Sequence, residues 1–301
     1  MLSIAKYAAI DIGSNAVRLL ISDVIEQGGQ PPKFKKSSLV RVPIRLGADV
    51  FLNKKISAEN EKRMIDTMTA FKLLMRSHNV FKYKACATSA MREADNGVAI
   101  SNLIKEQTGI QIDIINGEVE AAIIAATDLH SFIDENKTYL YVDVGGGSTE
   151  FTVIHLGKEI ASKSAKIGTV RLLNDMVEEK TWNKLKDWIE KHTSKYDKIE
   201  LIGSGGNINK IFKISGKAFG EPLTYFYLSA FYKMLQRHSY EERIVELNLK
   251  QDRADVIIPA TRIYLSAMKW SNAKHIYVPK IGLSDGIIKS IYQETIPSLV
   301  L

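Results

Sequence analysis

The 301-residue chain has a single cysteine, Cys86, so it cannot form an internal disulfide, and a reducing compartment is favoured. It lacks the run of about 18 apolar residues that a membrane-spanning helix requires. The few residues before Asp11 do not resemble a signal peptide. We therefore expect a cytoplasmic protein with no membrane partner.

Several kinds of binding site are also missing from the sequence. The six histidines are scattered without His-x-x-His or His-Glu-x-x-His spacing, which argues against a zinc site. The phosphate-binding P-loop motif is absent. The early basic cluster lacks the series of interleaved aromatic residues that would stack on successive bases, so we expect no nucleic-acid partner. The cluster consists of Lys33, Lys35, Lys36, Arg41 and Arg45.

The remaining composition is that of an ordinary globular protein, with 45% hydrophobic and 25% charged residues. A chain of 301 residues predicts two domains. The net charge of +7 is compatible with solubility alone, or with a polyanionic partner.

The most informative stretch is 139–151, YLYVDVGGGSTEF. An apolar run predicts a strand buried on both faces, which ends at Asp143. The following glycines permit positive φ and close approach of an anion to the backbone, and Ser148 adds a hydroxyl. Glu150 then begins a second strand. The glycines are Gly145, Gly146 and Gly147.

Asp143 and Glu150 flank this phosphate-sized turn. Carboxylate oxygens beside bound phosphate are the ligands that magnesium uses to hold a polyphosphate. The alternative is a plain β-hairpin, although a hairpin needs at most two of the three glycines.

The stretch 7–24, YAAIDIGSNAVRLLISDV, repeats this arrangement, with Asp11 ending a strand and Gly13, Ser14 and Asn15 forming the turn. Asp11 and Asp143 lie 132 residues apart. Internal repetition of this kind predicts two similar α/β halves, each with an anion-binding turn, facing one another across a cleft.

Between and after these motifs the sequence predicts alternating strands and helices. We expect one or two strands over 37–50, a helix from Ser57 to about His78, a strand over 82–88, a loop over 89–93 and a helix ending at Gly109. In the second half we expect a strand over 163–168, a mostly helical stretch over 170–195, and a third glycine-rich turn over 203–207. That turn follows a strand. Its glycines either allow a tight turn between strand and helix, or they face the same cleft as the first two glycine-rich turns.

Asn116 predicts the start of a further helix. Glu120 shares the helix face of Ile123 and Ile124, so its carboxylate should point inward, whereas Glu118 points to nearly the opposite side. An inward carboxylate is explained by a nearby cation or water; the alternative is that both acids only complement the helix dipole.

Together these segments resemble the exopolyphosphatase/guanosine-pentaphosphate phosphohydrolase (Ppx/GppA) family over nearly the whole chain. The matching segments are AIDIGSNAVRLL (9–20), CATSAMREADN (86–96), INGEVEA (115–121), DVGGGSTEF (143–151), IGSGGN (202–207), RADVIIPA (253–260) and GLSDGII (282–288).

The resemblance implies the actin-like ATPase superfamily fold, with two ribonuclease-H-like domains around a central cleft. We place these domains at 1–121 and 122–301, with a closing helix at about 287–301 that can pack back on the first. The resemblance also implies an exopolyphosphatase-type hydrolase that releases terminal phosphate from inorganic polyphosphate with Mg²⁺, or with Mn²⁺ as the alternative. The alternatives are a pppGpp 5′-phosphohydrolase and an actin-superfamily small-molecule kinase; a filament-forming protein and a homodimer are also left open.

Carried over by position, the resemblance makes Glu120 the base that activates water and Asp143 and Glu150 the metal ligands. Phosphate oxygens would be held by Gly13, Ser14, Asn15, Arg92, Gly145, Gly146, Gly147 and Ser148.

The sequence departs from the family pattern at three places. Ala16 replaces a serine, Val119 replaces the first acid of a Glu-Glu pair, and Ser284-Asp285 replaces a frequent Arg-Glu. The change at Val119 leaves Glu120 as the preferred catalyst.

Overall fold

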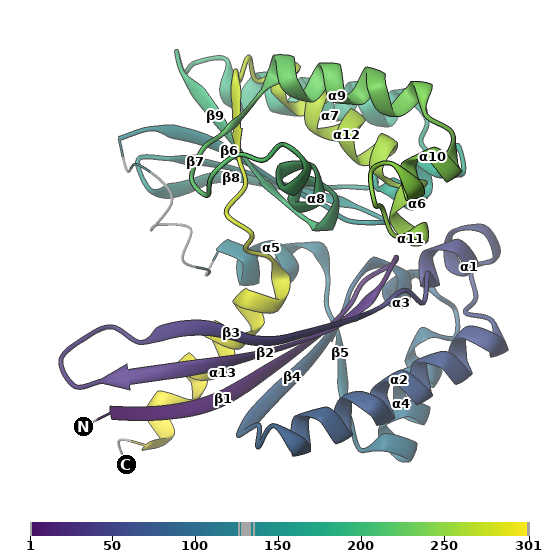
Figure 1. Cartoon of the computed structure of the whole chain (residues 1–301), viewed down its shortest axis with the longest axis vertical. Helices are drawn as coiled ribbons and strands as arrows, with labels where there is room; N and C mark the ends of the chain where they lie inside the picture. The colour runs from purple at the N-terminus through teal and green to yellow at the C-terminus, as the bar shows by residue number, and fades with distance from the viewer. Residues whose placement is uncertain (1, 126, 128–133, 135, 300–301) are drawn as a thin grey trace. The chain divides into compact units, whose positions relative to one another are not determined.

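The computed structural model describes residues 2–125, 127, 134 and 136–299. The chain divides into two compact units, which are described separately (Figure 1). Unit 1 contains residues 1–127 together with 283–301, and unit 2 contains residues 128–282. Each unit has one mixed β-sheet with helices against it, so the predicted α/β class is confirmed.

The sheet of unit 1 has the strand order β3-β2-β1-β4-β5. The first three strands form an antiparallel meander, and β4 and β5 add in parallel on the other side of β1. The strands are β1 (Leu2–Ile12), β2 (Val17–Gln27), β3 (Lys33–Val42), β4 (Lys82–Ala87) and β5 (Ile112–Ile114).

The helices of unit 1 begin and end largely where their capping residues predict. Ser57 caps α2, where its Oγ accepts a hydrogen bond from the Asn60 amide at 3.3 Å. Gly109 ends α4 with φ 76°, a left-handed conformation that favours glycine. The helices are α1 (Leu46–Asn53), α2 (Ala58–Ser77), α3 (Ser89–Glu93), α4 (Gly97–Thr108), α5 (Gly117–Ala125) and α13 (Leu283–Leu299).

Two predictions in unit 1 are wrong. The region after Val42 is the helix α1 rather than a second strand, and its Leu46, Val50 and Phe51 are buried at helical spacing. The expected loop over 89–93 is the short helix α3. In both places short-range apolar content did not distinguish a strand or loop from a short buried helix.

The sheet of unit 2 repeats the order of unit 1, with one short strand added at its edge: β8-β7-β6-β9-β11-β10. Three antiparallel strands are again followed by strands parallel to the first of them. This duplicated ribonuclease-H-like topology is that of the actin-like fold, as predicted. The strands are β6 (Thr138–Val144), β7 (Thr149–His155), β8 (Lys158–Ala165), β9 (Ile199–Ser204), β10 (Leu223–Thr224) and β11 (His275–Tyr277).

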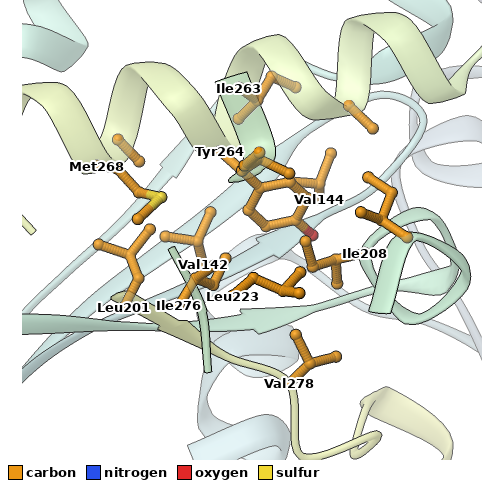
Figure 2. Packing of buried hydrophobic residues seen from close by; sticks show 14 of the residues in the cluster. Val142, Val144, Leu201, Ile208, Leu223, Ile263, Tyr264, Met268, Ile276 and Val278 are labelled. Atoms are coloured by element: carbon orange, nitrogen blue, oxygen red, sulfur yellow. The ribbon is translucent and has the colours of Figure 1, made fainter. Parts of the chain in front are cut away.

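The core of unit 2 lies between this sheet and α12 (Figure 2). Tyr264 and Met268 of α12 pack over Val142 and Leu201 of the central strands, and all four are fully buried. The helices are α6 (Thr169–Leu173), α7 (Glu179–Thr193), α8 (Gly206–Ile214), α9 (Tyr225–Arg237), α10 (Tyr240–Val245), α11 (Gln251–Ala254) and α12 (Ile257–Trp270).

The stretch 170–195 is mostly helical, as predicted, and consists of α6 and α7 with Asp175 between them at φ 54°. β8 differs from the prediction, since it spans Lys158–Ala165 rather than 163–168; its first residues are mostly exposed and do not alternate between apolar and polar.

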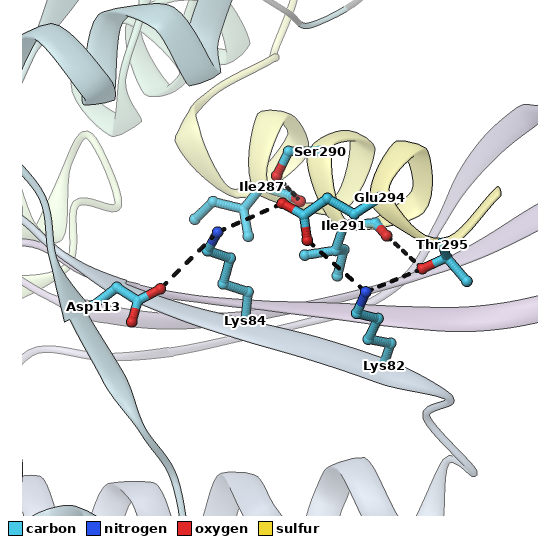
Figure 3. Close-up of polar contacts among 8 residues, drawn as sticks. All are labelled: Lys82, Lys84, Asp113, Ile287, Ser290, Ile291, Glu294 and Thr295. Carbon is cyan, nitrogen blue, oxygen red and sulfur yellow. Dashed lines mark hydrogen bonds and ion pairs between the residues drawn. The ribbon is translucent and has the colours of Figure 1, made fainter. Parts of the chain in front are cut away.

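The helix α13 packs on the sheet of unit 1, although it follows unit 2 in the sequence (Figure 1). Figure 3 shows Glu294 of α13 between two lysines of β4, with N–O distances of 3.9 Å to Lys82 and 3.8 Å to Lys84. The Lys82 ammonium also donates to Thr295 Oγ1 at 3.3 Å. Residues 300 and 301 of the predicted closing helix lie outside the described residues. Among the helices that the structure describes, none combines the length and apolarity needed to cross a bilayer.

Candidate active site

The turn between β6 and β7 in unit 2 has the predicted strand–turn–strand form. Asp143 and Glu150 are direct register partners on the two antiparallel strands. Cross-strand partners place their side chains on the same face of the sheet, at a Cβ separation of about 4.5–5.5 Å. Two carboxylates therefore lie side by side at the base of the turn. Glu150 is 2% exposed and Asp143 is half-buried.

Neighbouring hydroxyl groups orient the Glu150 carboxylate. Ser148 and Ser164 both donate hydrogen bonds to Glu150 Oε1, at 2.7 and 3.0 Å. Ser148 is thus part of the turn and also orients the Glu150 carboxylate. A buried acid that is held in this way is preorganised for a cation.

The backbone of the turn is oriented by α6. The amides of Thr169 and Val170 donate to the carbonyls of Gly145 and Gly146, at 3.0 and 2.9 Å. In a trans peptide the C=O and the following N–H point in opposite directions. The N–H groups after these carbonyls therefore point away from α6, as in a backbone anion site.

The amides of Gly146, Gly147 and Ser148 donate no hydrogen bond to any residue that the structure describes. The Gly145 amide instead closes the turn by donating to the Ser148 carbonyl at 3.0 Å. Three neighbouring N–H donors are thus available to an anion.

The third glycine-rich turn, after β9, lies next to Asp143 within unit 2. Ser204 is the register partner of Asp143 on the parallel strand β9. Gly205 has φ 114°, and a Cβ there would lie 3.4 Å from Asp143 Oδ1, so glycine keeps this side of the carboxylate open. The Tyr264 hydroxyl donates to the Ser204 carbonyl, and burial together with the Asp143 charge raises the pKa of Tyr264 well above its usual value.

In unit 1 the equivalent turn carries a different pair. Asp11 is the register partner of Arg18, whose guanidinium donates to Asp11 Oδ2 at 3.2 Å. Burial raises the pKa of Asp11, and the positive charge of Arg18 opposes that effect. The Gly13 amide donates to the Ala16 carbonyl at 3.1 Å, so the backbone closure repeats that of Gly145.

The other predicted residues of this turn are held by α1 and α3. Ser14 Oγ lies 2.9 Å from Ser89 Oγ, at the start of α3. The Asn15 carbonyl accepts from the Arg45 amide at 3.1 Å. Arg92, also on α3, donates from Nη1 to the Ile115 carbonyl at 2.6 Å. In unit 1 the structure thus joins Arg92 to the end of β5, directly before the helix that carries Glu120.

That helix, α5, has the predicted register. Asn116 Oδ1 accepts from the Val119 amide at 2.8 Å, which confirms Asn116 as the N-cap. Glu120 is 9% exposed, whereas Glu118 is exposed. Burial raises the pKa of Cys86 to about 12, and Asp11 and Glu120 are among the acids that add to this effect. The thiol is therefore protonated and unreactive at neutral pH.

The carboxylate groups of this site suit a metal ion that needs few protein ligands. Among the residues that the structure describes, no group of three or more Asp, Glu, His or Cys side chains could hold one. Magnesium commonly uses only one or two protein carboxylates and completes its shell with water and substrate phosphate. The adjacent pair Asp143 and Glu150 fits that requirement.

One residue at this site was not predicted. Arg171 on α6 is 6% exposed, and its Nε donates to the Gly147 carbonyl at 2.7 Å. In the sequence it is one cation in a predicted helix and reads as surface charge. The signal that could have found it is the Gly168-Thr169 pair, which marks a close backbone contact directly before the helix.

Comparison with known proteins decides the family. The model of the Ppx/GppA phosphatase family matches residues 37–295. The chain belongs to the Ppx/GppA phosphatase family. This match confirms the predicted family, and the matched range includes the turn that follows Asp143.

Curated relatives agree with this assignment. A bifunctional 3-dehydroquinate synthase/phosphatase of Fusobacterium nucleatum is 32% identical over 216 residues, covering 66% of this chain and 32% of its own length. Exopolyphosphatase 1 of Mycobacterium tuberculosis is 26% identical over 62% of this chain and 54% of its own length. A guanosine-5′-triphosphate,3′-diphosphate pyrophosphatase of Photobacterium profundum is 25% identical over 94% of this chain and 58% of its own length. The chain thus spans about one third to three fifths of these relatives.

Solved structures support the fold over the whole chain. An exopolyphosphatase from Cytophaga hutchinsonii has a TM-score of 0.82 at 22% identity and covers 96% of this chain and 98% of its own. The Ppx/GppA family member of Aquifex aeolicus has a TM-score of 0.75 at 24% identity, covering 97% and 99%.

Proposed function

We propose that this protein is an exopolyphosphatase-type hydrolase, which releases terminal phosphate from inorganic polyphosphate by attack of water on a phosphoanhydride bond. The observation that carries the proposal is the paired acids Asp143 and Glu150 beneath three available backbone N–H groups. An anion site directly beside two carboxylates suits a phosphate that arrives with a divalent cation.

The glycine turns bind and orient the substrate. In unit 2 the amides of Gly146, Gly147 and Ser148 donate to phosphate oxygens. In unit 1 the turn Gly13–Asn15 and Arg92 supply further donors. Phosphoryl transfer requires little covalent work from the protein, so positioning and neutralisation of charge supply most of the rate enhancement.

Asp143 and Glu150 hold Mg²⁺, or Mn²⁺ as an alternative. When bound, the ion offsets the negative charge of the phosphate oxygens. Ser148 and Ser164 keep the Glu150 carboxylate oriented, and Gly205 keeps the approach to Asp143 open.

Glu120 acts as the general base that orients or deprotonates the attacking water. It is the inward acid of α5, while Glu118 is exposed. A positioned base typically contributes ~10²–10⁴ in rate.

A second candidate is hydrolysis of guanosine pentaphosphate. It is favoured by the pyrophosphatase relative from Photobacterium profundum, whose match covers 94% of this chain. Both reactions break a phosphoanhydride bond at a chain end and would use the same residues. The single buried thiol agrees with a cytoplasmic location for either substrate.

The test is phosphate release from short polyphosphate, long polyphosphate and guanosine pentaphosphate, each with magnesium, manganese or chelator. We expect metal-dependent release of orthophosphate from polyphosphate ends without any acceptor molecule. Transfer of the phosphoryl group to an acceptor molecule, without release of orthophosphate, would identify a kinase instead. Internal cleavage products would contradict the exopolyphosphatase.

A further inference from the structure

The glycine turn of unit 2 is held from behind by the start of α6. Three consecutive turn carbonyls accept hydrogen bonds from this segment. The Thr169 amide binds the Gly145 carbonyl at 3.0 Å, and the Val170 amide binds the Gly146 carbonyl at 2.9 Å. The third bond comes from a side chain, Arg171 Nε to the Gly147 carbonyl at 2.7 Å.

This third bond has a specific consequence for Ser148. The peptide that joins Gly147 to Ser148 carries the last of the three available N–H groups. Because its carbonyl is fixed by Arg171, its N–H is fixed on the opposite side. Without the guanidinium, only the covalent bonds to the neighbouring residues would restrain the orientation of this peptide. A peptide next to glycine rotates easily.

The charge of Arg171 adds to this effect. The side chain is 6% exposed, so its positive charge lies in a poorly screened environment directly behind the turn. A hydrogen bond from a charged donor also polarises the peptide that accepts it and strengthens the N–H on the far side.

Gly168 makes this close support possible. A Cβ at Gly168 would lie 2.3 Å from the Gly146 carbonyl oxygen and 2.5 Å from the Gly147 carbonyl carbon. Both are backbone atoms, so any side chain would displace the turn from α6. Gly168 and Arg171 therefore form one device, the α6 support.

We propose that Arg171 is a positioning residue, which sets the phosphate affinity of the turn without touching the substrate. The proposal rests on the proposed function, because it assumes that the turn amides bind phosphate. The predicted effect is on substrate binding rather than on the chemical step, since the cradle holds the phosphate chain before and during reaction.

The chain offers a matched control in Arg243. This residue lies in the same unit and also binds backbone carbonyls, with Nε 3.1 Å from the His238 oxygen and Nη1 2.6 Å from the Ala254 oxygen. It connects α10 and α11 and, among the described residues, makes no hydrogen bond to the turn. Arg243→Gln reports what the loss of such an arginine does to stability alone.

The experiment compares the wild type with Arg171→Gln, Arg171→Lys and Arg243→Gln. Binding of methylenediphosphonate with magnesium is measured by calorimetry, KM and kcat are measured with tripolyphosphate, and melting temperature is recorded. Amide resonances of Gly146, Gly147 and Ser148 are followed during titration of the wild type with the same diphosphonate.

We expect Arg171→Gln to weaken diphosphonate binding and raise KM roughly 10- to 100-fold, the range of one charge-assisted hydrogen bond. Its kcat should stay within about threefold, since uniform binding is lost. Arg171→Lys keeps the charge but not the planar donor, and should bind with intermediate affinity. Arg243→Gln should lower the melting temperature without changing affinity.

The outcomes separate this proposal from the function on which it rests. If the three wild-type amides do not respond to diphosphonate, the cradle itself is wrong. If they respond but Arg171→Gln binds like the wild type, or Arg243→Gln weakens binding equally, Arg171 is not a positioning residue. Gly168→Ala is the second variant and should raise KM by displacing the same turn; an unchanged KM in a folded Gly168→Ala protein also overturns the proposal.

Discussion

The two β-hairpin turns share a backbone design but carry opposite charge patterns. In unit 1 the pair at the base of the turn is Asp11 and Arg18, and in unit 2 the equivalent pair is Asp143 and Glu150. The first pair neutralises itself through an ion pair at 3.2 Å. The second consists of two acids, which repel each other unless a cation is present. We infer that only the turn of unit 2 is built for a metal.

The backbone support is repeated more faithfully than the charges. In each unit a helix that follows the third strand donates its first amides to the turn carbonyls. In unit 1 these bonds run from the Gly47 amide to the Ser14 carbonyl at 2.7 Å, and from Arg45 to Asn15 at 3.1 Å. In unit 2 they run from the start of α6. The two units thus present turns with the same backbone support. The side chains at the base of each turn determine which of the two can bind a metal.

The largest expected effect concerns the acid that unit 1 supplies on α5. Glu120→Gln keeps the shape but cannot accept a proton, so turnover should fall by ~10²–10⁴. Substrate affinity should persist or increase, because one negative charge near a polyanion is removed. Turnover and KM at one magnesium concentration provide the measurement.

The control for this substitution is Glu118→Gln on the same helix. Glu118 is exposed, so its loss should cost only a helix-dipole contribution of ~0.3–1 kcal/mol in stability. An inactive Glu118→Gln beside an active Glu120→Gln would reverse the assignment of the two acids.

The second effect would make unit 2 resemble unit 1. Glu150→Arg places a cation opposite Asp143, as Arg18 lies opposite Asp11. Because the positive charge replaces a metal ligand, we expect turnover to fall about 100-fold or more. The milder Asp143→Asn and Glu150→Gln should raise the magnesium concentration needed for half-maximal rate.

Asp11→Asn is the comparison for these variants, since it alters the aspartate of the other pair. Its half-saturating magnesium concentration should equal that of the wild type. If the metal dependence of the rate changes in Asp11→Asn and not in Asp143→Asn, the metal binds in unit 1 and the assignment to unit 2 is wrong.

The third effect tests how unit 1 holds α5. A Cβ at Gly286 of α13 would lie 2.2 Å from the Ile123 carbonyl oxygen on α5. Gly286→Ala must therefore separate the helices, and we expect a loss of about 1–3 kcal/mol in the free energy of unfolding. Ser290→Ala, elsewhere on α13, should stay within about 0.5 kcal/mol. Urea unfolding of both variants gives the answer, and equal stabilities would contradict the close packing.

The smallest effect is a pH dependence that arises from Asp11. Burial raises its pKa in the folded state, so folding favours the protonated form. This contribution to stability is fully present below the ordinary pKa of aspartate and is lost as pH rises through the raised folded pKa. Its slope cannot exceed about 1.4 kcal/mol per pH unit. The difference in unfolding free energy between the wild type and Asp11→Asn should therefore fall with rising pH; a flat or rising difference would show that Arg18 fully offsets burial.

The sequence predicts the two hairpins well because each combines strong local signals. A buried strand, an acid at its end and a glycine-rich turn occur together, and the repeat around Asp11 and Asp143 predicts the duplicated topology. The inward direction of Glu120 follows from helical periodicity alone. The side-chain roles in catalysis and metal binding stay predictions.

The support behind the turns is not predictable in the same way. Arg45 adopts φ 63° before α1, and α1 forms where apolar residues suggested a strand. Arg171 is one of many cations in the sequence and becomes distinctive only through its contact with Gly147. Both depend on contacts between segments that lie about 20–30 positions apart, which periodicity over a short window does not report.

The packing of α13 on unit 1 also bears on how the chain folds during synthesis. All residues of unit 2, 128–282, leave the ribosome before residues 283–299 do. Unit 2 can therefore complete its core first, although domains ordinarily fold in order from the N-terminus. Until α13 arrives, unit 1 lacks the helix that packs on β1, β4 and α5. Unit 1 is therefore synthesised mostly first but completes its fold last. The helix α5, which carries Glu120, becomes fully packed only when α13 arrives.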